Sequence, residues 1–413
     1  GVSIDDVDSR SRRKKSQSPN DEGRTTDIRV RGGLETDMGA GGVIKINGGL
    51  RFRDNDFVLG FTPLKSKSDQ RSHIEEDTQL YDLNYVKEYA FWRRDHKFQL
   101  GIDYYDTDYV SERVDENQRK NSWVSNLGLF FTHEFGLRRD LRLNLGYRYN
   151  DYRGTFRNDE RRDLGGGQLV WVKGNNFDRN YDNNAYSVGL VYSPGEDTSF
   201  FASYATSFRV PNVDEFALAE DDLKPQEGAH IDVGLRQRLW DLAEFSVTLF
   251  QIEIEDEIFF DSNLQVNRNF DDTTRRRGIE TNVKLYPFKN LYLWGNYTYL
   301  EAKFEDRNTD VPLVPNHVAN VGLEWRIVEP FLFAFTGTLV GSQFDGNDEN
   351  NDTFKKLEAY RVFDAKLTYT YKNFKLFGGV NNIFDELYST VAFSEVYFPM
   401  PTRNFYGGIQ WSF

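Results

Sequence analysis

Apolar and polar residues alternate without a break over the last stretch of the chain, from Arg403 to Phe413. Every second residue is apolar, apart from one glycine, and the residues between them are mostly polar. The apolar set is Phe405, Gly407, Ile409, Trp411 and Phe413. Successive side chains of a strand point to opposite faces, so the pattern predicts a strand with one apolar face. Such a strand occurs in a half-buried soluble sheet, or in a transmembrane barrel whose apolar face meets lipid.

The same alternation recurs along most of the chain and is clearest between Leu141 and Tyr149, where arginines separate the apolar residues. An arginine is costly in lipid, so we expect Arg142 and Arg148 to face a wet lumen, and we place Glu253 there too. On the last strand we expect the apolar parity to face lipid. Many segments run near 10 residues, the length that a tilted membrane strand needs.

Short and long connections alternate along the chain. The expected short connections lie at 54–56, 94–96, 136–140, 193–197, 240–242, 288–290, 329–330 and 371–373. The expected long connections lie at 65–77, 110–122, 154–183, 209–228, 261–275, 305–316, 343–358 and 385–402. An outer-membrane barrel sorts its connections in this way, with short periplasmic turns and long outer loops. The count predicts about 16 strands from Val43 onward and one more near Ile28 to Leu34.

Composition supports a membrane strand protein and excludes several other classes. The 413 residues contain no Cys, and no run of 18 apolar residues that could form a transmembrane helix is present. Aromatic residues make up 15% of a chain that is only 38% hydrophobic, which aromatic girdles at two membrane interfaces would explain. The net charge of −14 argues against nucleic acid as a partner.

Catalytic and metal chemistry find little support in the sequence. The 5 His residues are scattered without a chelating spacing, and no Ser/His or Asp/His set gathers in one loop. Oxygen ligands between Asp345 and Asp352 have spacings that a calcium loop could use, although a solvated outer loop is the favoured explanation. We therefore predict no catalytic residue, no metal site, no cofactor and no enzymatic activity.

Six motifs in the second half of the chain resemble the barrel of TonB-dependent outer-membrane receptors. They are FASYATSFRVPNVDEF at 201–216, LKPQEGAHIDVGLR at 223–236, RRGIETNVKLYP at 276–287, VPNHVANVGLEW at 314–325, GGVNNIFDELY at 378–388 and MPTRNFYGGIQWSF at 400–413. The resemblance implies an all-β, antiparallel transmembrane β-barrel of the 22-stranded transporter class, present here as about 16–18 strands. The barrel is expected over residues 26–413, after a polar loop or tail over residues 1–25 with a basic run from Arg10 to Lys15.

The resemblance also implies a function and partners. Receptors of this family sit in the bacterial outer membrane and import ferric siderophores, cobalamin-like ligands or similar scarce nutrients, energised by the TonB complex through a plug region. No plug is recognisable in this chain and the strand count is odd, so we expect the barrel to be incomplete at its amino-terminal side. Outer-membrane lipid and lipopolysaccharide are further expected partners. A passive pore and a surface adhesin are the alternative functions.

Ligand-binding residues are expected in the outer loops, where rings and cations could contact a bulky anionic solute. The candidates are Phe216, Arg268, Phe270, Tyr388, Phe393, Tyr397, Phe398 and Arg403. Each of these rings could equally pack against its own loop.

Overall fold

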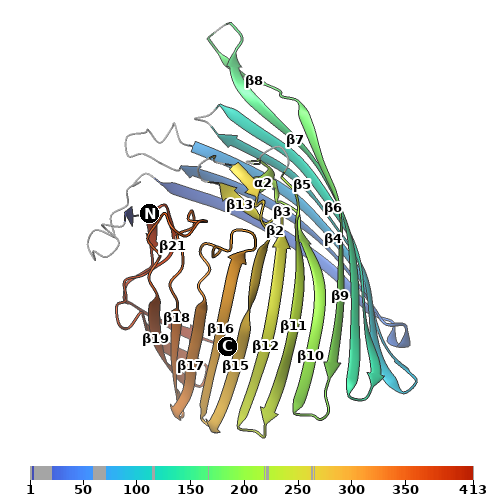
Figure 1. The fold of residues 1–413 in the computed structure, drawn as a ribbon, viewed down its shortest axis with the longest axis vertical. Helices are drawn as coiled ribbons and strands as arrows, with labels where there is room; N and C mark the ends of the chain where they lie inside the picture. The colour runs from blue at the N-terminus through green and yellow to red at the C-terminus, as the bar shows by residue number, and fades with distance from the viewer. Residues whose placement is uncertain are drawn as a thin grey trace.

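The structure is a computed structural model that describes residues 2–3, 21–58, 71–113, 117–165, 167–217, 219, 223–261, 264 and 266–412. Strands dominate it, and they form one large antiparallel sheet that curves into a barrel (Figure 1). Among these residues no helix has the length and apolar character needed to cross a membrane. The basic run from Arg10 to Lys15 lies outside the described residues.

Seventeen strands of eight or more residues build the wall within the described part of the chain. They are β2 (Glu22–Asp37), β3 (Val43–Val58), β4 (Arg71–Phe91), β5 (Arg94–Arg113), β6 (Gln118–Arg138), β7 (Leu141–Asp163), β9 (Asn176–Tyr192), β10 (Thr198–Arg209), β11 (Gln226–Leu239), β12 (Ala243–Glu255), β15 (Thr274–Phe288), β16 (Leu291–Phe304), β17 (His317–Val328), β18 (Phe331–Val340), β19 (Tyr360–Tyr371), β20 (Phe374–Asn381) and β23 (Asn404–Trp411). This agrees with the sequence count of 16 strands from Val43 onward and one before it.

Short elements lie between these strands. They are β1 (Val2–Ser3), η2 (Gly39–Gly41), β8 (Leu169–Val172), α2 (Val213–Ala217), β13 (Ile258–Asp261), β14 (Val266–Asn269), β21 (Ser389–Phe393) and β22 (Val396–Pro399). Each long strand is antiparallel to the next long strand along the chain, from the ladder of β2 with β3 to the ladder of β20 with β23. The all-β antiparallel fold is therefore as predicted.

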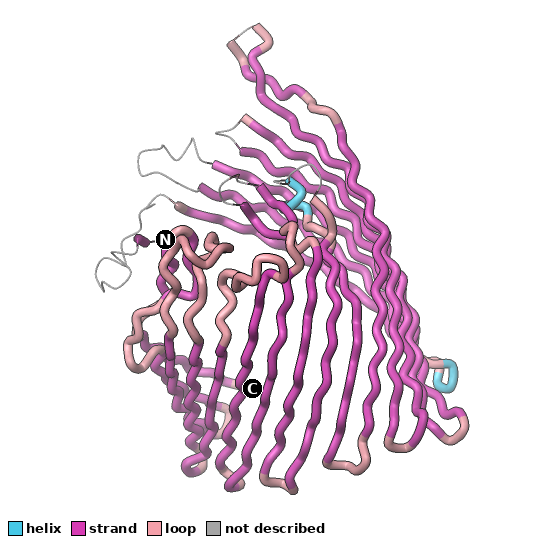
Figure 2. The backbone as a smooth tube through the Cα atoms, viewed as in Figure 1, coloured by secondary structure: helices cyan, strands magenta, loops and turns pink. Residues whose placement is uncertain are grey.

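Tight turns gather at one rim of the barrel and longer connections gather at the other (Figure 2). The turn expected at Asp54-Asn55-Asp56 is wrong, because β3 runs through these residues and they pair with both β2 and β4. The turn instead lies at η2. Polar residues such as Asp and Asn favour turns, but a wet strand end accepts them equally well.

Three connections that were expected to be long are mostly strand. Within 65–77, residues 71–77 belong to β4, and the others lie outside the described residues. β5 continues to Arg113 and β6 begins at Gln118, while β7 reaches Asp163 and β9 begins at Asn176. β7 alone has 23 residues, far more than the roughly 9–11 that a tilted strand needs to cross a bilayer. These strands form the tall side of the wall, and β8 extends it (Figure 1).

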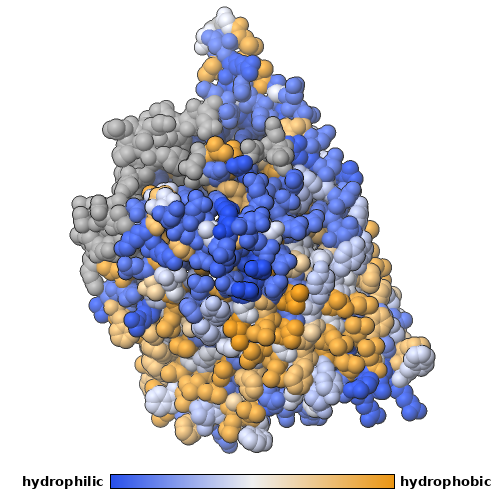
Figure 3. All heavy atoms as spheres, viewed as in Figure 1, coloured by the Kyte–Doolittle hydropathy of each residue, from blue (hydrophilic) through white to orange (hydrophobic). Residues whose placement is uncertain are grey.

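The two faces of the wall differ in polarity. Phe405, Ile409 and Trp411 are 75%, 74% and 61% exposed on the outward face, as expected for residues that meet lipid. Apolar residues cover the lower part of the face shown in Figure 3 and polar residues cover its upper part. Phe413 lies outside the described residues.

The predicted luminal arginines have the parity opposite to the lipid face. Arg148 lies between outward Tyr147 and Tyr149, and its guanidinium donates two hydrogen bonds of 2.8 Å to the carboxylate of Asp103 on the inner face. Arg142 has the same parity as Arg148, opposite to exposed Leu145. Paired guanidinium and carboxylate groups fit a polar lumen.

Glu253 departs from its prediction. Its strand β12 places Glu253 on the same face as Leu249, which pairs with Val233, and both of these apolar residues are exposed on the lipid side. Glu253 therefore points outward, and the luminal assignment is wrong. It lies near the outer end of β12 beside Arg275 of the neighbouring strand, beyond the apolar band, where both faces are wet and alternation no longer identifies the lumen.

Candidate recognition surface on the outer loops

Four outer connections meet at one part of the outer rim, and we refer to residues 256–273, 305–316, 341–359 and 382–403 as the outer-loop assembly. They follow β12, β16, β18 and β20, so they are successive outer connections of the wall. Short ladders occur within the assembly, β13 with β14 and β21 with β22. Polar contacts between the four connections then hold them together.

Asp345 organises two of these connections although it was expected on a solvated loop. Its side chain is fully buried, and its Oδ1 accepts hydrogen bonds from the backbone N–H groups of Asn347 at 3.0 Å and Ser394 at 2.7 Å. Its Oδ2 accepts a third from the N–H of Glu395 at 3.0 Å. One carboxylate therefore joins residues 341–359 to the turn between β21 and β22.

Asp348 has a similar role within its own loop. Its carboxylate is 1% exposed and accepts backbone hydrogen bonds from Asp352, Thr353 and Phe354 at 3.1–3.2 Å. Two of the four carboxylates of the candidate calcium loop are thus directed at amide hydrogens. These residues fold the loop, and the solvated-loop description is wrong for both of them.

Arg307 connects the loop after β16 to its two neighbours. Its guanidinium lies 3.5 Å from Asp272 and 2.9 Å from Glu349, and it covers the ring of buried Phe304 at 4.0 Å. In the same region, Asn351 accepts a hydrogen bond from the N–H of Asp310 at 2.6 Å. Charge-assisted bonds of this kind are stronger than neutral ones, so the three connections are held in one arrangement.

A depression of about 400 Å³ opens between these loops, and two predicted site residues, Arg268 and Phe270, line it. Phe270 stacks on Phe259 with ring centroids 3.9 Å apart, so much of its ring surface is used in packing. Arg268 lies 3.5 Å from the carboxylate of Asp261. The lining carries more carboxylates than cations, so the depression favours a cationic group over a free anion.

The remaining predicted residues of the last outer loop divide into packed and exposed rings. Tyr397 is 5% exposed in a small cluster with Leu357 and Ala392, and Tyr388 stacks near Tyr360 with centroids 4.5 Å apart. Both tyrosine rings therefore contribute to packing.

Phe393 and Phe398 are 41% and 45% exposed and meet edge to face at 6.4 Å. Arg403 lies at the base of this loop, where its guanidinium donates to the carbonyl of Ile383 and lies 4.0 Å from Asp385. The structure therefore brings two exposed rings together at the rim and gives Arg403 a structural contact.

Phe216 lies on α2, beside the outer-loop assembly: Ile258 of β13 packs against its cluster, and the side-chain amide of Asn267 in β14 donates to the carbonyl of Glu215 at 3.1 Å. Phe216 is 4% exposed and packs with Tyr152, Phe156 and Leu223 in an aromatic cluster against the inner wall. α2 follows β10, and the chain therefore folds its β10–β11 connection onto the tall side of the barrel (Figure 1).

A polar network beside α2 has no counterpart in the sequence analysis. The hydroxyl of Tyr109 donates to Asp214 of α2, and Arg53 lies 3.9 Å from the same carboxylate and 2.7 Å from Glu76. The only available signal is the alternation of charged residues along the ends of β3 and β4. Cross-strand register, which a single sequence does not show, brings them together.

His73 also gains partners that sequence spacing could not reveal. It pairs across the ladder with Asp56, and its ring lies near Asp54 and Glu75. Within the described residues these three, Asp54, His73 and Glu75, are the group whose ligand atoms converge closely enough to hold a metal ion. The spacing of the histidines in the sequence does not reveal this convergence, because it depends on the register between β3 and β4.

A family model described as TonB dependent receptor-like, beta-barrel, matches residues 2–383. The chain belongs to this family. TonB-dependent receptors are outer-membrane β-barrel proteins of Gram-negative bacteria, which places this chain in that membrane. The family is one of transporters and receptors.

Relatives of the chain include other TonB-dependent receptors. The catecholate siderophore receptor Fiu of Escherichia coli K12 is 25% identical over 227 residues, which is 49% of this chain and 29% of that protein. The probable TonB-dependent receptor BfrD of Bordetella pertussis is 26% identical over 283 residues, which is 62% of this chain and 36% of that protein. The match thus spans about a third of these curated relatives.

Solved structures share the fold over nearly the whole chain. The ferric-catecholate import receptor Fiu of E. coli K12 in its closed form superposes with a TM-score of 0.80 at 17% identity, covering 96% of this chain and 65% of that one. The ferric citrate transporter FecA in its unliganded form gives a TM-score of 0.80 at 15% identity, covering 99% and 65%. At these identities the likeness shows the fold alone.

Proposed function

We propose that this chain forms the wall and outer loops of a receptor that imports a ferric siderophore or a comparably bulky, scarce nutrient. The observation that carries the proposal is the outer-loop assembly, in which Asp345, Asp348 and Arg307 hold long loops in one arrangement at the barrel mouth. A pre-organised surface binds a solute with less loss of conformational entropy than free loops do. General pores need an open, charge-lined lumen instead.

The names of the relatives support this class of ligand. They include receptors for catecholate siderophores, ferric citrate and ferripyoverdine, and a vitamin B12 transporter. Their ligands are large and metal-bearing. We therefore infer that this receptor recognises a solute of that class, and that import draws its energy from the TonB complex.

Within the outer-loop assembly we assign ligand contact to its exposed and cavity-lining groups. Phe393 and Phe398 offer ring surface at the rim, while Arg268 and Phe270 line the acidic depression. Aromatic faces suit the planar rings and aliphatic arms of an iron chelate. The other predicted residues stabilise this surface through packing and loop contacts; they are Phe216, Tyr388, Tyr397 and Arg403.

Uptake of labelled iron by low-iron cells tests this function. Deleting the gene for the parent protein is expected to abolish uptake from one chelate among catecholate, hydroxamate and citrate complexes, or of labelled cobalamin, and the intact gene should restore it. Phe398→Ala in the parent protein is expected to raise the apparent KM severalfold, because half of an exposed ring pair is lost.

The matched control is Phe200→Ala, which removes an exposed ring of the outward wall far from the outer loops. This variant should leave the KM unchanged. If uptake of all four solutes survives deletion, the import proposal fails. An adhesin would instead lose attachment to a surface while uptake stays intact.

A further inference from the structure

We propose that Asp54, His73 and Glu75 form a binding site for a first-row divalent transition metal ion on the outward face of the wall. The three side chains come from the outer ends of β3 and β4, where Asp54 pairs directly with Glu75 and Asp56 pairs with His73. Asp54 follows Phe52, an exposed outward residue, by two residues along β3 and therefore shares its face. The site therefore lies just beyond the lipid-facing band and apart from the outer-loop assembly.

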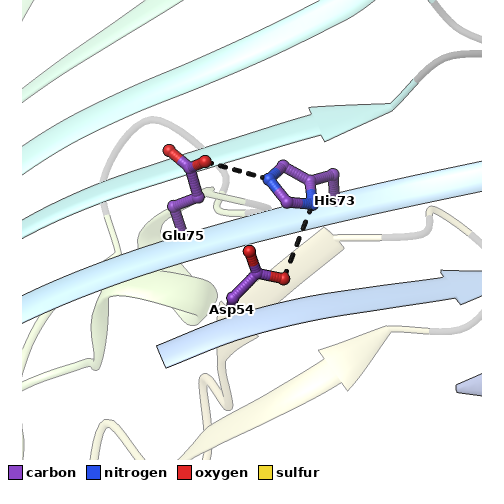
Figure 4. A group of neighbouring side chains, drawn as sticks. All are labelled: Asp54, His73 and Glu75. Carbon is purple, nitrogen blue, oxygen red and sulfur yellow. Dashed lines mark hydrogen bonds and ion pairs between the residues drawn. The ribbon is translucent and has the colours of Figure 1, made fainter. Parts of the chain in front are cut away.

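Both ring nitrogens of His73 lie close to carboxylate oxygens. Nδ1 is 3.1 Å from Oδ1 of Asp56 and 4.0 Å from Oδ1 of Asp54, and Nε2 is 3.1 Å from Oε1 of Glu75. Figure 4 shows the imidazole with its two nitrogens directed at Asp54 and Glu75. A neutral imidazole carries one N–H, so only one of the two 3.1 Å contacts can be a hydrogen bond.

Asp56 is the natural acceptor of that single N–H. Its Oδ1 is 3.1 Å from Nδ1 of His73 and also accepts from the guanidinium of Arg71 at 3.1 Å, so the carboxylate is fixed and partly neutralised. With Nδ1 protonated, the Nε2 lone pair faces the oxygen of Glu75. Two electron-rich atoms at this distance repel unless a proton or a metal ion lies between them.

A metal ion relieves this repulsion and uses the arrangement that metal-binding histidines have in many proteins. One nitrogen binds the ion while the other donates its N–H to a carboxylate, which fixes the tautomer and the ring orientation. One ligand atom from each of Asp54, His73 and Glu75 lies within 4.8 Å of the other two. Metal–ligand bonds of about 2.0–2.2 Å require somewhat closer approach, which exposed carboxylates can make by rotation.

The donor set determines which ion fits. One imidazole and two carboxylates suit ions such as Zn²⁺ and Mn²⁺, whereas Mg²⁺ and Ca²⁺ prefer oxygen ligands alone. Other charges on the same face include Asp77, which follows Glu75 by two residues, Arg24, opposite Asp56, and Glu112, opposite His73. The bound ion would join β3 to β4 at their outer ends and strengthen that hairpin.

Titration of the tag-free parent protein in detergent with Zn²⁺, followed by calorimetry at neutral pH, tests the site. The wild type is expected to bind one Zn²⁺ at this site, with Mg²⁺ in excess failing to compete. His73→Ala and the isosteric Glu75→Gln are each expected to weaken the affinity at least tenfold. Zn²⁺ should also raise the Tm of the wild type and leave that of His73→Ala unchanged, with heat-modifiable migration on gels confirming that both are folded.

His230→Ala is the matched control, because His230 faces the lumen and contacts the hydroxyl of Ser207 at 2.8 Å. This variant should keep the wild-type affinity. Equal Zn²⁺ affinity in wild type and His73→Ala would overturn the proposal. Absence of Zn²⁺ binding by the folded wild type would also overturn it.

Discussion

Leu249→Arg is expected to destabilise the folded barrel by about 2–4 kcal/mol, the cost measured for arginine on the lipid face near the bilayer midplane. Leu249 lies on the outward face of β12 and is 56% exposed, between Val233 on one side and Ile279 on the other. An arginine there has apolar neighbours in both adjacent strands and lipid in front of it. Reversible unfolding of the parent protein in lipid vesicles, followed by tryptophan fluorescence, gives the free energy.

Thr248→Arg is the control for this substitution, since Thr248 is the residue before Leu249 in β12 and faces the lumen opposite Glu280. Water and a carboxylate are available to an arginine at that position, so we expect a change below about 1 kcal/mol. Equal losses in the two variants would contradict the assignment of faces.

Asp345→Ala is expected to release the last outer loop from its neighbour. Three backbone N–H groups, those of Asn347, Ser394 and Glu395, would lose their buried acceptor. Bonds to a charged group contribute about 1.5–3 kcal/mol each, and unsatisfied amides add a further cost, so we expect a local loss of about 3–5 kcal/mol. Hydrogen exchange of residues 389–399 in the parent protein should accelerate accordingly, while exchange in β15 to β20 stays slow.

Asp352→Ala provides the control on the same loop. Asp352 is exposed, and its carboxylate accepts one side-chain hydrogen bond, from Thr353 at 3.1 Å. Its removal should leave exchange in residues 389–399 unchanged. Equal protection of those residues in wild type and Asp345→Ala would show that the buried carboxylate does not hold the loops together.

Local pattern in the sequence was sufficient for the architecture of the wall. Alternation identified the strands within the bilayer, because lipid and lumen impose opposite polarity on the two faces there. Turns such as Lys372-Asn373, between β19 and β20, were also predictable, since Asn is a residue that favours turns. These features depend on neighbours a few positions apart.

The same rules failed above the bilayer, where both faces of a strand are wet. Asp54-Asn55-Asp56 looked like a turn and Glu253 looked luminal, although each sits near the outer end of a strand that continues beyond the apolar band. In water, polarity carries no information about face or about strand ends.

The composition of the sites depended on register and loop folding, which a single sequence does not contain. Burial of Asp345 depends on the N–H groups of Ser394 and Glu395, about 50 residues later in the chain. Two of the partners of His73, Asp54 and Asp56, come from the neighbouring strand β3, which begins 30 residues earlier. Contacts at this separation depend on the three-dimensional fold. The sequence could therefore name the candidate rings and arginines, but it could not show which of them are packed and which are exposed.

Parallel measurement of ligand binding and uptake in cells with and without TonB tests the proposed function most directly. Cells producing the parent protein should bind the labelled chelate identified in the deletion experiment at 0 °C in both backgrounds, since the outer-loop assembly forms the binding surface. On warming, uptake should follow only where TonB is present. Equal uptake without TonB would show a passive pore, and absence of saturable binding in either background would contradict the account.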